Sequence, residues 1–237
     1  NPELTSRSLP HYPPTVMRMV IMLLLLFFLA GPGCAETRAQ DVPSSKNRVS
    51  IVDGLGRAVT LDRPAVRIAS LSPGMTESLF AIGCDDRVVV RDRWSDFPAA
   101  AVRLPAVEGV NPSVDAVALY RPDLVILYFS DDRHAAAFEV LDIPVAIFDP
   151  RNYDQVASDI EKLGVLCGRP DRAAELARTM RERRDAVRQR TAGMSPLRVY
   201  VEVDGADDAR PWTAGPGSFV NELIESAGAV NVFASLE

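Results

Sequence analysis

Histidine and cysteine are scarce in this sequence of 237 residues, which contains two histidines and three cysteines. Zinc and catalytic metal sites are built largely from these residue types, so we expect no metal site. A basic run is also missing, because 26 Lys and Arg stand against 32 Asp and Glu and give a net charge of −6. Contact with phosphates needs clustered Lys and Arg, so we expect no nucleic-acid partner.

Catalytic motifs are missing as well. The sequence has no Gly-x-Ser-x-Gly, no Walker loop and no Gly-x-Gly-x-x-Gly after a strand. His134 lies beside Asp131 and Asp132, but a lone histidine near a helix start is typical of a solvated surface. We therefore expect no catalytic residue, no cofactor and no enzyme activity. An exported α/β enzyme stays the alternative from another class.

The N-terminus carries an apolar run, Val20 to Ala30, preceded by Arg18. A membrane-spanning helix needs ~20 apolar residues, so this run fits the core of a secretory signal. We expect residues 1–35 to hold upstream residues and a signal peptide, and the protein to reach the periplasm or the extracytoplasmic membrane face. Cys34 is a candidate lipidation site, and cleavage after Ala35 is the alternative.

A Pro- and Ser-rich tether is expected over residues 36–48, and an alternation of strands and helices follows it. Residues 49–52 and 58–61 predict a β-hairpin. Further strands are predicted at 67–71, 87–90, 124–128 and 145–148, and helices at 73–82, 114–120, 133–141 and 153–166. This order is typical of an α/β fold with a mostly parallel sheet covered on both faces. We assign residues 49–169 to an N-terminal lobe.

A long helix is predicted over residues 171–191, which contain neither Gly nor Pro. Its many arginines alternate with acidic residues, a pattern typical of a solvated face rather than an RNA-binding surface. We assign 170–192 to a linking helix. A strand at 197–203, a helix at 218–227 and a strand at 230–233 then begin a C-terminal lobe, 193–237. The cysteines Cys84 and Cys167 are interpreted as small buried residues, with a disulfide as the alternative.

Aromatic residues follow the predicted strands. Trp94, Tyr128 and Trp212 each lie at the carboxyl end of a strand, where open α/β sheets hold their ligands. Three such residues favour a cleft that stacks on a flat ligand surface. For each one, a place over the core of its own lobe is the alternative.

Several motifs in order carry a resemblance to a family. Residues 67–83, 94–98, 104–111 and 119–126 resemble the first lobe of periplasmic binding proteins for vitamin B12 and ferric siderophores, and 218–233 resembles the second. The resemblance covers residues 48–237 and is closest in pattern to the vitamin B12 binders. It implies two Rossmann-like lobes joined by one rigid helix, and delivery of a small ligand to an ABC importer. Members of the family continue well past Phe233, so we expect the second lobe to be truncated.

The resemblance also implies roles for single residues. Glu77 and Glu225 match the glutamates that dock the two lobes onto the permease dimer. The expected ligand-binding residues are Ser72, Trp94, Glu108, Tyr128 and Trp212. The protein is expected to be a monomer that binds a corrinoid of the cobalamin type.

The identity of the ligand has alternatives. A ferric siderophore is the second candidate, because Val107 stands where the vitamin B12 protein carries an aromatic residue. Haem binding and an exported sensor domain rank lower, and residues 107–111 lack the tyrosine that haem-binding relatives use.

Overall fold

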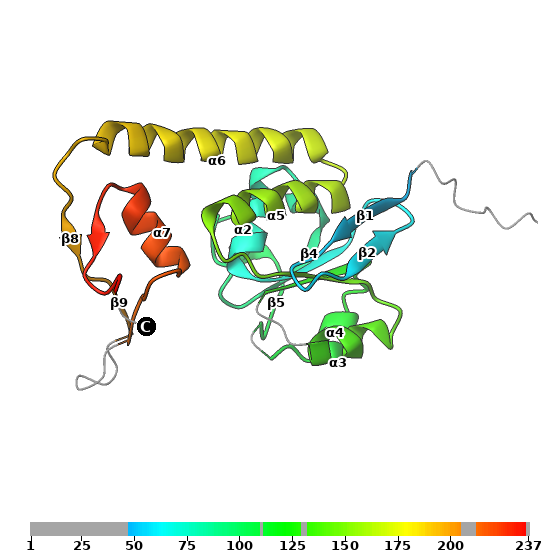
Figure 1. Cartoon of the computed structure of the whole chain (residues 1–237). Coiled ribbons are helices and arrows are strands. Elements are labelled where there is room, and N and C mark those ends of the chain that lie inside the picture. The colour runs from blue at the N-terminus through cyan, green and yellow to red at the C-terminus, as the bar shows by residue number, and fades with distance from the viewer. Residues whose placement is uncertain (1–46, 110, 129–131, 205–211, 236–237) are drawn as a thin grey trace, which may run out of the picture. The chain divides into compact units, whose positions relative to one another are not determined.

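The computed structural model describes residues 47–109, 111–128, 132–204 and 212–235. Residues 43–237 form one compact unit (Figure 1). The expected signal segment, Cys34 and nearly all of the tether lie outside the described residues. Within the described ranges, no helix combines the length and the apolar character needed to cross a bilayer.

A parallel sheet of five strands forms the centre of the first lobe, in the order β5-β4-β3-β6-β7. The strands are β3 (Ile68–Leu71), β4 (Val88–Asp92), β5 (Ala106–Val107), β6 (Leu124–Tyr128) and β7 (Val145–Phe148). All four residues of β3 and of β7 are buried. Strands with apolar residues on both faces form a sheet that must be covered twice, which confirms the predicted fold class.

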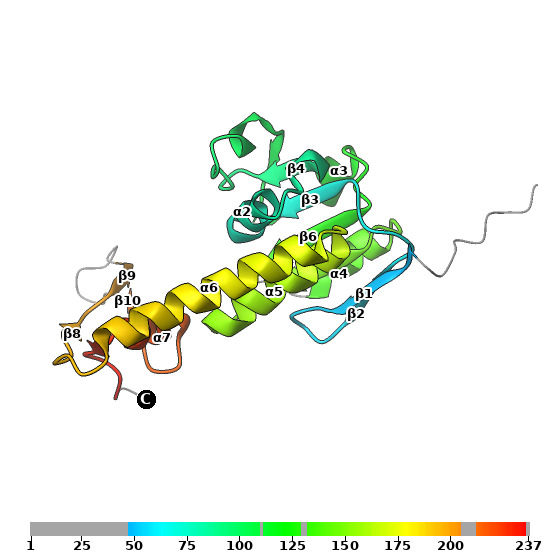
Figure 2. The same cartoon turned by 90° about the horizontal axis from the view of Figure 1, so that it is seen from above.

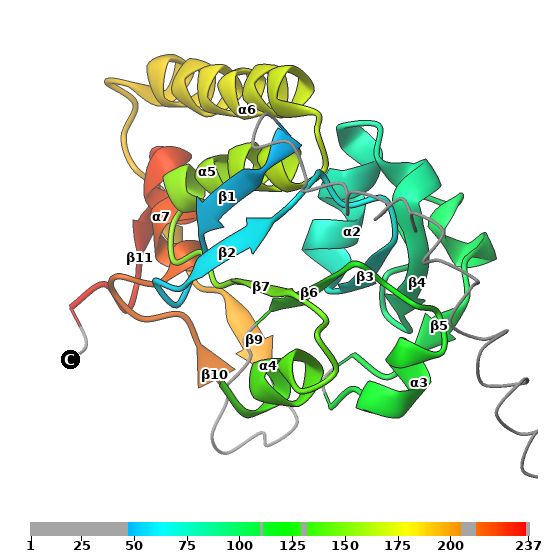
Figure 3. The same cartoon turned by 90° about the vertical axis from the view of Figure 1, so that its right-hand side faces the viewer.

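Helices cover the two faces of this sheet (Figure 3). One face packs against α2 (Pro73–Ala81), α5 (Tyr153–Leu166) and the hairpin of β1 (Val49–Val52) and β2 (Ala58–Leu61). The other face packs against α3 (Val114–Ala118) and α4 (Asp132–Glu139). Alternate residues of one strand face opposite sides, so Ile126 enters the first core and Leu127 the second.

The helix α6 (Pro170–Thr191) follows α5 and packs along it (Figure 2). Its 22 residues give a length of about 33 Å at 1.5 Å per residue. Pro170 begins the helix, where no intrahelical N–H bond is lost. The hydroxyl of Tyr153 donates to the carbonyl of Met180 at 3.0 Å, and Arg181 pairs with Glu161 at 2.9 Å. These contacts fix one half of the helix to the first lobe.

Short elements follow α6. They are β8 (Arg198–Val199), β9 (Glu202–Asp204), β10 (Trp212–Thr213), α7 (Phe219–Ser226) and β11 (Val230–Asn231). The strand predicted at 197–203 is divided in two, because β8 pairs in parallel with β11 whereas β9 pairs antiparallel with β10. Tyr200 and Val201 lie between the two and belong to neither strand.

Cys84 and Cys167 are both buried and free, which confirms their interpretation as small core residues. The Cys84 thiol donates to the carbonyl oxygen of Cys167 at 3.9 Å. The hydrogen bond with Cys84 and burial together raise the pKa of the Cys167 thiol. A protonated, buried thiol is a poor nucleophile.

Candidate ligand-binding site

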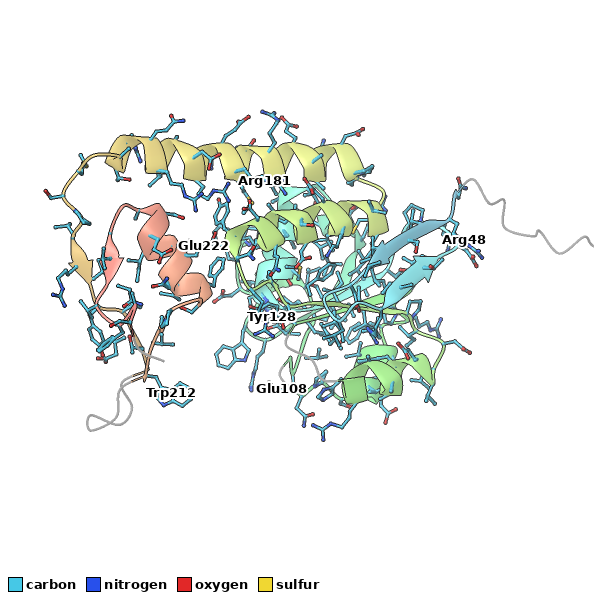
Figure 4. All side chains as sticks on the ribbon, in the orientation of Figure 1. Arg48, Glu108, Tyr128, Arg181, Trp212 and Glu222 are labelled. Atoms are coloured by element: carbon cyan, nitrogen blue, oxygen red, sulfur yellow. The ribbon has the colours of Figure 1, made fainter. Side chains whose placement is uncertain are left out.

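The carboxyl ends of β3, β4, β6 and β7 lie along one edge of the sheet, because the strands are parallel. Polar and aromatic side chains gather in the loops that leave this edge. Figure 4 labels two of them, Glu108 and Tyr128. Open α/β sheets bind their ligands at this edge, so these loops form the candidate site.

The loop after β4 presents an aromatic ring and an ion pair. Trp94 is 62% exposed. The guanidinium of Arg93 lies 5.7 Å from the centre of the Trp94 ring and donates to Glu108 at 2.8 Å. The stacked cation orients the ring, which leaves an apolar surface flanked by one positive and one negative group.

A buried polar network holds this loop in place. The Asp92 carboxylate accepts hydrogen bonds from the Trp94 backbone N–H at 2.8 Å and from the Ser95 hydroxyl. Ser95 in turn accepts from Thr76 of α2 at 2.9 Å, and Thr76 bonds Ser70 of β3 at 2.8 Å. Buried networks in which every polar group has a hydrogen-bond partner are rigid, so the loop that carries Trp94 is held in one conformation.

The ends of β6 and β7 form the second part of the site. Tyr128 closes β6, and its pKa is raised by burial and by the negative charge of Asp149, which follows β7. Asp149 makes an ion pair with Arg151 through Oδ2. Its other oxygen, Oδ1, is buried and has no hydrogen-bond partner within the part of the chain that the structure describes.

A cavity of about 310 Å³ lies beside these residues. It is lined by Tyr128, Pro150, Arg151, Val156, Gly217, Ser218 and Phe219. The last three residues belong to the start of α7 and the loop before it. The cavity therefore joins the edge of the five-stranded sheet to the elements that follow α6.

The other expected ligand-binding residues have different surroundings. Ser72 is buried, and its hydroxyl accepts from the Met75 N–H at 3.5 Å as the N-cap of α2. Trp212 lies in β10 and is 73% exposed. The structure thus gathers Trp94, Glu108 and Tyr128 on one sheet edge and places Trp212 on a separate strand pair.

Three residues of this edge were missed by the sequence prediction, namely Arg93, Asp149 and Arg151. The sequence does carry a signal for them, since each follows a predicted strand within a few residues. The prediction considered Trp94 and left out its neighbour Arg93, and it named no residue after the strand at 145–148.

The two expected docking residues are both exposed, Glu77 on α2 and Glu225 on α7. Glu225 accepts a hydrogen bond from the Asn221 amide at 2.8 Å.

No cluster of three His, Cys, Asp or Glu side chains suited to a metal occurs in the described ranges.

Comparison with known proteins identifies the family of this chain. The model of the periplasmic binding protein family matches residues 68–237. The chain belongs to the periplasmic binding protein family. The match includes the five-stranded sheet, α6 and the elements that follow it.

Single relatives agree with the family assignment. The chain is 30% identical to the vitamin B12-binding protein of Yersinia pestis (strain Pestoides F) over 176 residues, which are 72% of this chain. It spans 61% of the length of that relative. The same figures hold for the vitamin B12-binding protein of Yersinia pseudotuberculosis serotype O:1b.

Solved structures of the periplasmic binding protein family show the same fold. The periplasmic vitamin B12 binding protein BtuF of Vibrio cholerae is 28% identical, with a TM-score of 0.62 over 73% of this chain and 68% of its own. The periplasmic heme-binding protein RhuT from Roseiflexus sp. RS-1 is 25% identical, with a TM-score of 0.64 over 70% of this chain and 65% of its own. Two homologues with a common fold are therefore named for binding different ligands.

Proposed function

We propose that this chain captures a corrinoid of the cobalamin type outside the cytoplasm and delivers it to an ABC importer. The observation that carries the proposal is the exposed ring of Trp94, held on a rigid loop at the carboxyl edge of the sheet, the edge at which Tyr128 also lies. A flat, largely apolar macrocycle gains most from stacking on such rings. The named vitamin B12-binding relatives support the same ligand class.

A ferric siderophore is the second candidate ligand. The exposed arginines Arg93 and Arg151 favour it, because a ferric chelate with an overall negative charge would be attracted to guanidinium groups. Each of these arginines, however, is paired with a carboxylate. The pairing reduces the net positive charge of the site and favours an uncharged periphery on the ligand.

Delivery is assigned to Glu77 and Glu225. One exposed acid on α2 and one on α7 can meet two basic pockets on a dimeric permease. Charged pairs at the rim of an interface mainly set encounter rate and register. We propose an exported, monomeric protein whose partners are this permease and one small ligand. The proposed role is capture without chemical conversion.

Titration calorimetry with a panel of ligands tests the proposal. The purified 237-residue chain is titrated with cyanocobalamin, dicyanocobinamide, haemin and two ferric siderophores. The proposal expects saturable 1:1 binding of the two corrinoids, tighter than that of the other ligands. Tighter binding of a siderophore would select the second candidate, and tighter binding of haemin would reject both.

A further inference from the structure

Two ion pairs lie along the sheet edge, and each consists of one arginine and one carboxylate. Arg93 pairs with Glu108 beside Trp94, and Arg151 pairs with Asp149 beside Tyr128. Arg93 and Asp149 come directly after the ends of β4 and β7. Each aromatic ring of the proposed site therefore has one guanidinium and one carboxylate next to it.

Neither ion pair is explained by the stability of the fold. The side chains of Arg93 and Glu108 are 59% and 44% exposed, and exposed pairs contribute little to folding because water and salt screen them. Asp149 is 12% exposed, and its Oδ1 has no partner in the described residues. A buried acceptor without a donor is destabilising, so the stability of the fold does not account for a carboxylate at this position.

An arginine–carboxylate pair matches one chemical group well. A primary carboxamide has a carbonyl oxygen that accepts and an NH₂ group that donates. The guanidinium can donate to the carbonyl while the carboxylate accepts from the NH₂ group. A ligand carboxylate at the same place would have no proton for Glu108 or Asp149 and would be repelled by both.

The distance between the two pairs limits the shape of the ligand. The strands β4 and β7 are separated by β3 and β6, and three steps of ~4.8 Å between neighbouring strands give about 14 Å. One amide cannot reach both pairs. The ligand must instead present amides on two sides of a body that covers Trp94 and Tyr128.

We infer that Arg93–Glu108 and Arg151–Asp149 are specificity determinants that select carboxamides over carboxylates on the periphery of the ligand. This inference rests on the proposed binding of a corrinoid and deepens it. It separates amidated corrinoids from their acid precursors and from other macrocycles that carry free carboxylates.

Two corrinoids that differ in these groups provide the test. Dicyanocobinamide carries peripheral amides, whereas dicyanocobyrinic acid carries carboxylates at the same positions. Titration calorimetry of the 237-residue chain at neutral pH should give a dissociation constant at least about tenfold lower for the amide form. In the Glu108→Gln/Asp149→Asn variant, the ratio of the dissociation constants of the acid and amide forms should fall towards one. The reason is that this variant should bind the acid form more tightly than the wild type does.

Matched variants keep the result interpretable. The exposed pair Arg178–Glu182 of α6 has a distance of 2.8 Å between its nitrogen and oxygen atoms, as Arg93–Glu108 does. It lies outside the proposed site, so Arg178→Gln/Glu182→Gln should leave the preference for the amide form unchanged. Glu108→Gln alone, at an exposed position, repeats the test without altering the buried Asp149. Equal binding of both corrinoids, or a preference unaffected by Glu108→Gln, would overturn the inference and leave the proposed function standing. Failure to bind either corrinoid would reject the proposed function and the inference with it.

Discussion

The carboxylate of Glu222 in α7, which Figure 4 labels, accepts a hydrogen bond from the backbone N–H of Tyr153, the first residue of α5, at 2.7 Å. The N–H groups of the first helical turn have no partner within their own helix. Their positive end also attracts a carboxylate. An element that follows α6 is thus joined to a helix that covers the central sheet.

Replacing Glu222 by Ala should weaken this junction. We expect a loss of about 1 kcal/mol in the free energy of unfolding, the usual effect of losing a hydrogen bond at a helix N-terminus. Urea unfolding followed by circular dichroism measures the change. Glu175→Ala, on the exposed face of α6, is the control. Equal unfolding midpoints for Glu222→Ala and the wild type would show that the contact adds nothing to stability.

The buried Asp159 of α5 predicts a pH dependence. Burial raises the pKa of Asp159 above its ordinary value of 3.8, and the hydrogen bond from Lys162 opposes the shift. The folded state therefore holds the proton more tightly than the unfolded chain. It follows that the free energy of unfolding falls as the pH rises from about 3.8 through the raised pKa.

Asp159→Asn removes this titration. Relative to the wild type, the variant should gain stability as the pH rises from about 4 to 7, and the gain should level off above the folded pKa. Urea unfolding at several pH values measures it, with the exposed Asp86→Asn as the control. A constant difference over the whole range would contradict the role given to burial.

Trp94→Ala should weaken ligand binding by roughly 1–3 kcal/mol, the scale of a lost aromatic contact. Calorimetry with cyanocobalamin measures the dissociation constant. Leu119→Ala shortens an apolar residue that is 82% exposed at the end of α3, and it should leave the dissociation constant unchanged. An unaltered affinity in a folded Trp94→Ala protein would remove this residue from the site.

Reversal of the two proposed docking charges should separate transport from binding. Glu77→Lys/Glu225→Lys should abolish uptake of the ligand in cells that carry the cognate importer, because like charges would then meet at the interface. The affinity of the purified protein for cyanocobalamin should stay within about twofold, since exposed charges at a distance are screened by salt. Glu175→Lys/Glu182→Lys on α6 is the control. Wild-type uptake by the docking variant would show that these residues do not dock.

The first lobe was largely predictable because its signals are local. The runs that form β6 and β7 are apolar and bounded by turn residues, and their predicted bounds agree with the structure. The helix α5 also has its predicted bounds, since Asn152 caps its start and Gly168 follows its end. In each case neighbouring residues determine the element.

The missed elements depend on distant partners. The strand β5 has only two residues and exists because Arg91 and Asp92 of β4 pair with it. The division between β8 and β9 likewise follows from pairing with β11 and β10. At the site, the aromatic residues were predicted from their positions after strands, whereas the joining of Arg93 to Glu108 needed the three-dimensional fold.

Quenching of a single tryptophan tests the central claim most directly. The sequence has two tryptophans, so Trp212→Phe leaves Trp94 as the only one. Cyanocobalamin absorbs in the region of tryptophan emission and should quench Trp94 fluorescence in a saturable way, with the dissociation constant that calorimetry gives for this variant. Free tryptophan in the same solutions corrects for absorbed light. A corrected signal that shows no saturable quenching would contradict the capture of a corrinoid at Trp94.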